Sequence, residues 1–286
     1  MSVFLVTGAS RGLGRSVVET ALRAGHRVVA GVRDVSALGE LVGVFPDALE
    51  VVPLDVTDAP AAERAVQIAV ERFGGLDVVV NNAGYANVAS IEDVDPEDFR
   101  AQVETNLFGV VTVTRAALPV LRRQGHGHIV QVSSVGGRMA TPGLGAYQTA
   151  KWAVGGFSSV LAKEVAPFGV RVTVLEPGGM RTDWAGSSMR IAPVRPEYES
   201  TVGVSARMHD GGSIGASDPR LVAELLLRVV AMDEPPLRLL VGPDAFRHGT
   251  AAGRALLAED ERNESLSRST TAADVTEAQL DPLAQA

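Results

Sequence analysis

Cysteine is absent from the whole 286-residue chain. This absence excludes disulfides, thiolate-ligated zinc, iron–sulfur clusters and thiol nucleophiles. The sequence also lacks an apolar run of the roughly 20 residues that cross a bilayer, and no basic leader precedes the first apolar segment. Basic residues are outnumbered by acidic ones, 26 to 34, for a net charge of −8. Such a chain repels nucleic acids and anionic membranes, so we expect a cytoplasmic protein with neither as a partner.

The residues that are present suit one large α/β domain. Hydrophobic residues make up 46% and charged residues 21% of the chain, which is enough to bury a sizeable core. Short β-branched runs alternate with segments of helical periodicity. The expected strands are 3–7, 27–32, 49–53, 78–81, 128–133, 171–175 and 238–241, and the expected helices are 13–24, 59–73, 96–121, 147–165 and 221–232. This alternation predicts a Rossmann-like, doubly wound, seven-stranded parallel sheet with helices on both faces.

Two regions depart from the alternation. Residues 184–218 contain glycine, serine and proline but no strand or long helix, and such a stretch inside a compact domain is usually functional. We interpret it as a lid over a substrate site. Beyond residue 258 the sequence is polar and has no aromatic residue. The expected organisation is therefore a single domain over 1–258, followed by a loosely ordered or docking tail over 259–286.

A glycine-rich turn follows the first expected strand. The segment Thr7-Gly8-Ala9-Ser10-Arg11-Gly12-Leu13-Gly14 leads from that strand into a helix. Glycines let the backbone approach a pyrophosphate, and the helix N-terminus offers unpaired N–H groups. The turn therefore predicts dinucleotide binding, through Gly8, Ser10, Arg11, Gly12, Leu13 and Gly14. Its spacing differs from the commoner Gly-x-Gly-x-x-Gly, and an ordinary glycine-rich turn is the alternative.

The residues after the second strand bear on which dinucleotide binds. Arg33 and Asp34 are adjacent there. A guanidinium would bind a ribose 2′-phosphate, whereas a carboxylate would accept a hydrogen bond from a free 2′-hydroxyl. If Val32 ends the strand, Arg33 turns over the adenosine and Asp34 points towards the next helix. With Arg11 as a second cation, this arrangement favours NADP(H) over NAD(H), and the alternative is that both arginines are solvated surface charges.

Two further strand ends offer cofactor contacts. Asp55 and Val56 follow the third strand, where an adenine amino group could donate to the carboxylate. A helix-start aspartate is the alternative. Asn82, Ala83 and Gly84 follow the fourth strand, where small residues leave room for a cofactor. Turn formation alone would also explain this second segment.

A tyrosine and a lysine share one helical face. Tyr147 and Lys151 lie four positions apart at the start of an expected helix. An ammonium near a phenol favours the phenolate and lowers its pKa from about 10 towards a value suited to proton transfer. Ser134 ends the fifth strand, at the edge where open α/β sheets bind ligands. Asn106 is a polar residue among apolar helix neighbours, and its amide needs partners such as a water or a carbonyl near Lys151. Each feature alone has a simple structural explanation.

Together these residues resemble the short-chain dehydrogenase/reductase family in its compact single-domain form. The resemblance covers roughly residues 1–245. It rests on Thr7-Gly8-x-x-x-Gly12-x-Gly14, Asn81-Asn82-Ala83-Gly84, Asn106, Ser134, Tyr147-x-x-x-Lys151 and Pro177-Gly178, all in the expected order. Each motif is weak alone, but their ordered coincidence is specific.

The resemblance implies roles for the catalytic set. Tyr147 would be the acid/base, and Lys151 would bind the nicotinamide ribose and lower the pKa of the tyrosine. Ser134 would position the substrate oxygen, and Asn106 would hold a water beside Lys151. Members of this family transfer hydride directly between the nicotinamide and a substrate carbon, and many of them are homodimers or homotetramers.

The same resemblance implies cofactor contacts beyond the glycine-rich turn. Pro177, Gly178 and Thr182 would lie against the nicotinamide, although Thr182 follows with one more intervening residue than in the shortest family form. A basic residue after the second strand is common in NADP-preferring members, which agrees with Arg33.

The expected function is an NADP(H)-dependent reduction of a ketone, or oxidation of the corresponding secondary alcohol. The residues expected to line the substrate pocket are Tyr85, Met139, Leu144, Trp184 and Met189, together with Tyr198. Their apolar character suggests a hydrophobic substrate, and the alternative is that they only hold the lid in place.

Three other functions need different features. A 3-oxoacyl-carrier-protein reductase would favour a basic entrance, to which Arg138, Arg181, Arg190 and Arg195 could contribute. A regulator that binds NADPH without turnover would not need the complete proton-transfer set. A serine hydrolase would need a Gly-x-Ser-x-Gly motif, which the sequence lacks. We expect no metal, because His126 and His128 are interpreted as loop residues rather than ligands.

Overall fold

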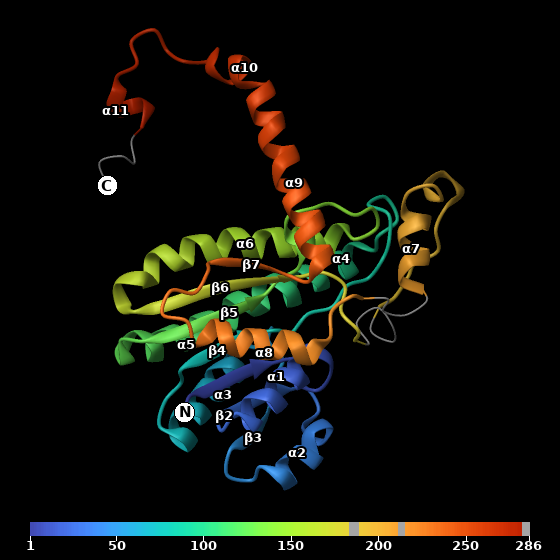
Figure 1. Ribbon diagram of the computed structural model, residues 1–286. Helices are drawn as coiled ribbons and strands as arrows, with labels where there is room; N and C mark the ends of the chain where they lie inside the picture. The colour runs from blue at the N-terminus through green and yellow to red at the C-terminus, as the bar shows by residue number, and fades with distance from the viewer. Residues whose placement is uncertain (183–188, 211–214, 282–286) are drawn as a thin grey trace.

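The computed structural model describes residues 1–182, 189–210 and 215–281. Within these ranges, seven parallel strands form one sheet in the order β3-β2-β1-β4-β5-β6-β7 (Figure 1). Because β1 lies between β2 and β4, the chain winds one way from β1 to β3 and the other way from β4 to β7. In sheets of this kind, ligands bind beyond the carboxyl ends of the strands where the winding reverses. The expected fold class is confirmed.

The element bounds are as follows. The strands are β1 (Val3–Thr7), β2 (Arg27–Val32), β3 (Leu49–Pro53), β4 (Val78–Asn81), β5 (Gly127–Val132), β6 (Val170–Pro177) and β7 (Arg238–Val241). The α-helices are α1 (Gly12–Arg23), α2 (Gly39–Val44), α3 (Ala59–Phe73), α4 (Pro96–Val103), α5 (Gly109–Gln124), α6 (Gly145–Val165), α7 (Val202–Asp210), α8 (Pro219–Val230), α9 (Pro243–Arg262), α10 (Glu264–Arg268) and α11 (Glu277–Leu280). Short 3-10 turns include η1 (Val35–Leu38) and η3 (Val135–Gly137), and η2 (Glu104–Phe108) is a π-helical turn.

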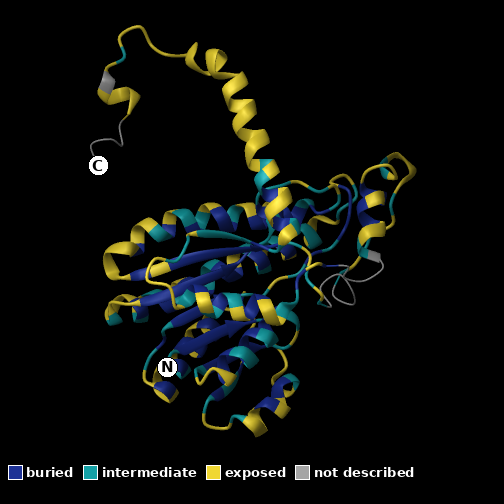
Figure 2. Cartoon of the chain, viewed as in Figure 1, coloured by how far each residue is buried: buried dark blue, intermediate teal, exposed yellow. Residues whose placement is uncertain are grey.

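Apolar side chains cover both faces of the sheet. In β1, Phe4 and Val6 belong to the cluster under α1 and α8, whereas Leu5 belongs to the cluster under α3, α5 and α6. This alternation follows from the two-residue period of a strand. Figure 2 shows the sheet buried between the two helical layers. Such burial on both faces explains why the strands are almost continuously apolar.

The expected helix 96–121 is interrupted, which corrects the sequence-based prediction. It consists of α4, the π-helical turn η2 and α5. Asn106 lies in η2, and its Nδ2 donates to the carbonyl of Gln102 at 2.8 Å. That carbonyl is the one that the backbone amide of residue 106 would use in an α-helix, so the side chain competes with the helical ladder.

Several helices were not predicted from the sequence. Helix α7 lies within the expected lid, and α9 runs through residue 258 to Arg262. The domain boundary drawn at 258 therefore falls inside a helix. The first half of α9 is anchored through Ala245 and Gly249, whereas Leu256 and Leu257 are exposed on the half that projects from the body (Figures 1 and 2). The weak apolar periodicity of the projecting half explains why this helix was not predicted.

Neither a membrane span nor a metal site emerges from the described ranges. No helix in them is both long enough and apolar enough to cross a bilayer. No group of three or more histidine, cysteine, aspartate or glutamate side chains in them could hold a metal ion.

His128 is a buried residue of β5 and not a loop residue, which corrects the earlier interpretation. Its Nε2 lies 2.9 Å from Thr173 Oγ1, and Thr173 Oγ1 donates to the carbonyl of Pro236.

The buried His128 predicts a pH-dependent stability. Burial lowers the pKa of His128 from 6.5 to about 4, so between these values the unfolded chain binds more protons than the folded chain. Stability should therefore rise with pH across this window and be lost as the pH falls from 6.5 towards 4, by about 2–3 kcal/mol at the acid end. We expect His128→Gln, which can still donate to Thr173, to lose less free energy of unfolding than wild type between pH 6.5 and 4.5 in denaturant titrations. Equal losses in the two proteins would contradict this account.

Candidate active site

The glycine-rich turn is packed too tightly for side chains. Gly8 has a φ of +62° and Gly12 a φ of +54°, conformations that favour glycine. A Cβ on Gly8 would lie 2.8 Å from Ala83 Cα, and one on Gly14 would lie 2.5 Å from Asn82 Nδ2. Asn82 Nδ2 donates to the carbonyls of Thr7 and Gly8 at 3.0 and 3.2 Å. The turn after β1 and the segment after β4 therefore form one rigid unit at the carboxyl edge of the sheet.

Helix α1 begins at this turn without a polar cap. Its N-cap residue is Arg11, whose side chain makes no capping hydrogen bond, and its first turn contains no acidic residue. The first N–H groups of a helix need partners and attract anions. The glycines and these donors fit a pyrophosphate, with Ser10 and Leu13 flanking the turn. This end of the sheet therefore suits a dinucleotide cofactor.

The structure separates the roles of the two residues after β2. Asp34 accepts hydrogen bonds from the backbone N–H and the hydroxyl of Ser36, so it caps η1 and points towards the next helix as expected. Asp55 forms a local turn, in which hydrogen bonds from the backbone N–H and the hydroxyl of Thr57 lower the pKa of its carboxyl. The charge of Arg33, whose side chain is exposed, is a smaller cause of the same lowering. Val56, which follows Asp55, is buried.

Tyr147, Lys151 and Ser134 meet at the ends of β5 and α6. Lys151 Nζ donates to the carbonyl of Val132 at 2.9 Å and lies 5.6 Å from the centroid of the Tyr147 ring. Ser134 accepts a hydrogen bond from the backbone N–H of Gly136 at 3.0 Å. Both Tyr147 and Lys151 are buried. The expected proximity of these three side chains is thus present.

Burial dominates the protonation of this pair. It raises the pKa of Tyr147 to about 12, and a hydrogen bond with Ser134 partly opposes that rise. Burial also lowers the pKa of Lys151 to about 8. The lowered tyrosine pKa expected from the lysine is therefore not found, because desolvation is the larger effect and only the hydrogen bond with Ser134 opposes it. At neutral pH the tyrosine is a protonated phenol.

Asn106 lies directly beside the pair. Its Nδ2 donates to the carbonyls of Tyr85 and Gln102, both at 2.8 Å. Its Oδ1 is buried without a hydrogen-bond partner among the described residues. A Cβ on Gly84 would lie 2.5 Å from this oxygen and 3.6 Å from Lys151 Nζ. Backbone carbonyls thus satisfy the Asn106 donor as expected, and its acceptor faces the space next to Lys151.

The segment after β6 packs against the glycine-rich turn. Thr182 lies against the glycine-rich turn, since a Cβ on Gly12 would be 3.6 Å from its side chain. Gly178 donates to the carbonyl of Val241 at 3.0 Å, and Gly179 donates to Asp244 Oδ2 at 2.7 Å. Sequence reasoning missed Asp244. Its local signal, an aspartate after proline at a helix start, gives no indication of a partner 65 positions away.

The residues expected to line the substrate pocket lie in different places. Leu144 packs in a small apolar cluster with Tyr147, and Met189 and Tyr198 pack against it. Helix α7 contributes Val202 to the same cluster. The remaining expected residues are Tyr85 and Met139, which are half-buried outside this cluster, and Trp184, which lies outside the described residues.

The arginines considered for a carrier-binding entrance are engaged elsewhere. Arg138 pairs with Glu176, Arg190 lies 3.4 Å from Asp98, and Arg195 pairs with Glu92 and Asp93. Arg181 Nε donates to the carbonyl of Gly215. Pairing within the chain reduces the positive potential that would attract an acidic carrier.

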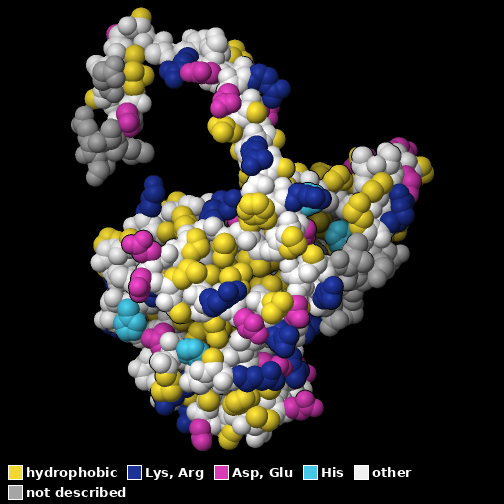
Figure 3. All heavy atoms as spheres, in the orientation of Figure 1, with side chains coloured by type: hydrophobic (Ala, Val, Ile, Leu, Met, Phe, Trp, Pro, Cys, Tyr) yellow, Lys and Arg dark blue, Asp and Glu magenta, His cyan; other side chains and the backbone are white. Residues whose placement is uncertain are grey.

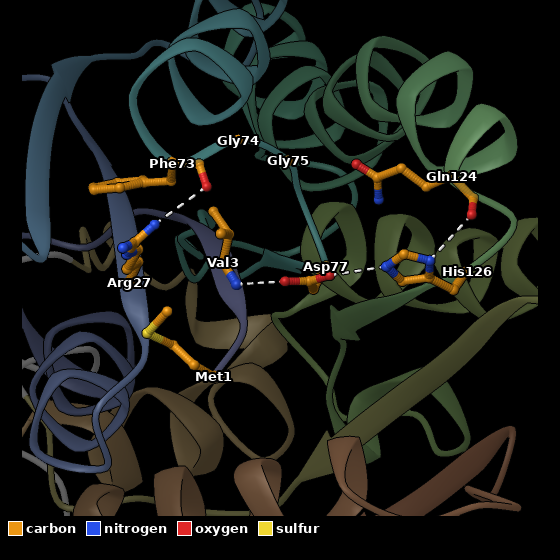
Figure 4. Close-up of a pocket in the computed structure, with 9 residues that line it drawn as sticks. All are labelled: Met1, Val3, Arg27, Phe73, Gly74, Gly75, Asp77, Gln124 and His126. Carbon is orange, nitrogen blue, oxygen red and sulfur yellow. Dashed lines mark hydrogen bonds and ion pairs between the residues drawn. The ribbon is translucent and has the colours of Figure 1, made fainter.

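A separate hollow of about 260 Å³ lies at the opposite edge of the sheet. Figure 4 shows it between the starts of the strands, with Asp77 linking Val3 N and His126 Nε2. Arg27 and Phe73 form another wall. None of the residues predicted for catalysis or cofactor binding lines this hollow, so we do not regard it as the active site.

Comparison with known proteins agrees with this geometry. The family model described as short chain dehydrogenase matches residues 2–190. Oxidoreductase BOA17 of Botryotinia fuckeliana is 53% identical over 269 residues, which cover 93% of this chain and 97% of that protein. A 3-ketodihydrosphingosine reductase of Bacteroides thetaiotaomicron is 31% identical, with coverage of 84% and 88%. The crystal structure of a short-chain dehydrogenase from Streptomyces avermitilis superposes with a TM-score of 0.88 at 36% identity and covers 94% of this chain and 98% of its own.

Proposed function

Because this chain belongs to the short-chain dehydrogenase family and is an oxidoreductase, we propose that it reduces a ketone to a secondary alcohol with NADPH. The observation that carries the proposal is the buried group at the end of β5, where Tyr147 is hydrogen-bonded to Ser134 and lies beside Lys151. This group lies beside Gly84, in the segment after β4 that packs on the glycine-rich turn. A bound nicotinamide supplies the hydride.

The chain's own residues manage the proton. Ser134 holds the carbonyl oxygen of the substrate, and Tyr147 donates its phenolic proton to that oxygen. The raised pKa of Tyr147 keeps the phenol protonated at neutral pH, which suits the reducing direction. Lys151, held by the carbonyl of Val132, binds the nicotinamide ribose, and Asn106 Oδ1 anchors a water that returns a proton to this pair.

The substrate in this proposal is apolar next to its carbonyl. The support is the cluster around Tyr147, in which Leu144, Val202 and Met189 are all hydrophobic. The name of the Bacteroides relative specifies a ketone reductase, which agrees with the reaction type. A carrier-protein substrate has less support, because Arg138, Arg190 and Arg195 are already paired with carboxylates.

Assembly and location are also part of the proposal. We expect a homodimer or homotetramer in the cytoplasm. Figure 3 shows apolar side chains gathered on the face that carries β7. Leu237, which precedes β7, and Phe246, in the first turn of α9, are exposed hydrophobic residues. Apolar patches of this kind are typical of contact surfaces.

Cofactor consumption tests the reaction. The purified protein should oxidise NADPH in the presence of apolar ketones of graded size, and faster than it oxidises NADH. Tight NADPH binding without turnover of any ketone would instead favour a nucleotide-binding regulator.

Arg33→Ala tests the choice of cofactor. If the exposed guanidinium binds the 2′-phosphate, this variant should bind NADPH more weakly by roughly 1–3 kcal/mol and bind NADH almost unchanged. Calorimetric titration of both cofactors measures the difference, with Arg11→Ala as the parallel variant. An equal loss for the two cofactors would overturn the assignment of Arg33, and a selective loss in Arg11→Ala alone would transfer it to Arg11.

A further inference from the structure

A fully buried carboxylate lies below the carboxyl edge of the sheet. Glu176 is the penultimate residue of β6, and its side chain has no solvent exposure. Arg238 of β7 donates to Glu176 Oε1 through Nε at 2.9 Å and Nη2 at 2.5 Å. Arg138 Nη2 lies 2.5 Å from the other carboxylate oxygen, Oε2. One carboxylate therefore meets two guanidinium groups, whose side chains are only 30% and 31% exposed.

Stability alone is a weak reason for this arrangement. Desolvating a carboxylate is costly, and apolar replacements of buried ion pairs are often neutral or stabilising. The positions of Glu176 and Arg138 in the chain suggest a better reason for the ion pair between them. Glu176 immediately precedes Pro177-Gly178, which opens the segment that packs on the glycine-rich turn. Arg138 ends the short turn η3 that begins after Ser134. The ion pair therefore joins the two sides of the candidate site.

The segment from Ser133 to Arg138 is also tied to the catalytic helix. Ser133 Oγ donates to the carbonyl of Lys151 at 3.3 Å. A Cβ on Gly137 would lie 2.9 Å from the same carbonyl oxygen. The segment is thus packed against α6 at Ser133 and Gly137, and Arg138, which follows Gly137, ties it to β6. A displacement at the Arg138 end would move Ser134 relative to Tyr147.

We propose that the Glu176–Arg138 ion pair is a positioning contact, which sets the distance between Ser134 and the segment 177–182 across the active site. This inference rests on the proposed function, because it assigns both sides to one reaction. Arg138 acts through Ser134 and does not touch the reacting atoms. Arg238 neutralises the same carboxylate from β7, through Oε1, and lies against Gly155 of α6 and not in the segment that carries Ser134.

The two arginines provide a matched comparison. Arg138→Met and Arg238→Met each remove one guanidinium from Glu176 and leave it the other, so both variants should fold with similar losses of thermal stability. We expect kcat to fall about tenfold to a hundredfold in Arg138→Met, because small misplacements of a positioning group carry costs of that order. KM for NADPH should stay within about twofold, since the glycine-rich turn is unchanged. Arg138→Lys should recover part of the lost kcat, and Arg238→Met should keep kcat within about threefold of wild type.

Amide hydrogen exchange separates this inference from the proposed function. The backbone N–H groups of Gly136, Gly137 and Arg138 are hydrogen-bonded within the turn. In Arg138→Met these amides should exchange about tenfold faster or more, because local opening becomes easier, whereas in Arg238→Met they should not. Equal exchange in both variants, or equal losses of kcat in both, would overturn the positioning role. Absence of turnover in wild type would overturn the proposed function, and the exchange comparison would still decide whether the pair holds the turn.

Discussion

Replacing Tyr147 by phenylalanine should reduce turnover by about a hundredfold or more, because the variant keeps the ring but removes the proton that general acid catalysis needs. The ring packs with Leu144 and Val202 in a small apolar cluster, and phenylalanine preserves those contacts. Cofactor affinity should therefore be largely retained. Steady-state kinetics with NADPH and a ketone, together with NADPH binding measured by fluorescence, separate the two effects.

A second hydroxyl deletion on the same helix serves as the control. Ser159 Oγ donates to the carbonyl of Gly155 within α6, beyond Lys151 and away from the edge of the sheet. Ser159→Ala should leave turnover within about twofold of wild type, as is usual for a substitution away from functional features. Unchanged turnover in Tyr147→Phe would remove the acid/base role from this residue.

Placing a side chain at Gly14 should disrupt cofactor binding. An alanine Cβ there would contact the carbonyl oxygen of Gly8 and lie 2.5 Å from Asn82 Nδ2. Neither group can move without breaking the hydrogen bonds that join Asn82 to the turn. Overpacking of this kind destabilises the packed conformation of the turn by about 1–3 kcal/mol. If NADPH binds only to that conformation, its affinity should fall by roughly tenfold to a hundredfold. Both cofactors should be affected, unlike in Arg33→Ala.

Another glycine offers a matched control for this change. Gly43 lies in α2, and a Cβ there would meet nothing within 4 Å. Gly43→Ala should bind NADPH like wild type and be slightly more stable, because alanine favours a helix over glycine by about 1 kcal/mol. If Gly14→Ala binds NADPH as tightly as Gly43→Ala, the glycine-rich turn is not the cofactor site.

The sequence predicted features that depend on local chemistry. The periods of strands and helices predicted the bounds of β1 to β4 and β7, the glycine-rich turn and the four-residue spacing of Tyr147 and Lys151. The bounds of β5 and β6 differ, at 127–132 and 170–177 against the expected 128–133 and 171–175. Because parallel strands end at one edge, Ser134 and Asn82 could be assigned to the same side of the sheet. The orientation of Asp34 also followed, since aspartate readily caps a following turn.

Features that depend on distant partners were not predictable. The π-helical turn arises because Asn106 competes for the carbonyl of Gln102 and also bonds that of Tyr85. Asp244 and Glu176 act on segments that are far away along the chain. The pKa of Tyr147 depends on how completely the fold buries it, and burial raises this pKa where the sequence had led us to expect a lowering by Lys151.

Transfer of an isotope label follows the hydride from the cofactor to the substrate. The purified protein is incubated with an apolar ketone and NADPH that carries two deuterium atoms at the nicotinamide C4, and the alcohol is analysed by mass spectrometry. We expect deuterium on the carbinol carbon with wild type and at least about a hundredfold less product with Tyr147→Phe. Tight NADPH binding with no deuterated alcohol from any ketone, or equal product from the two proteins, would contradict this expectation.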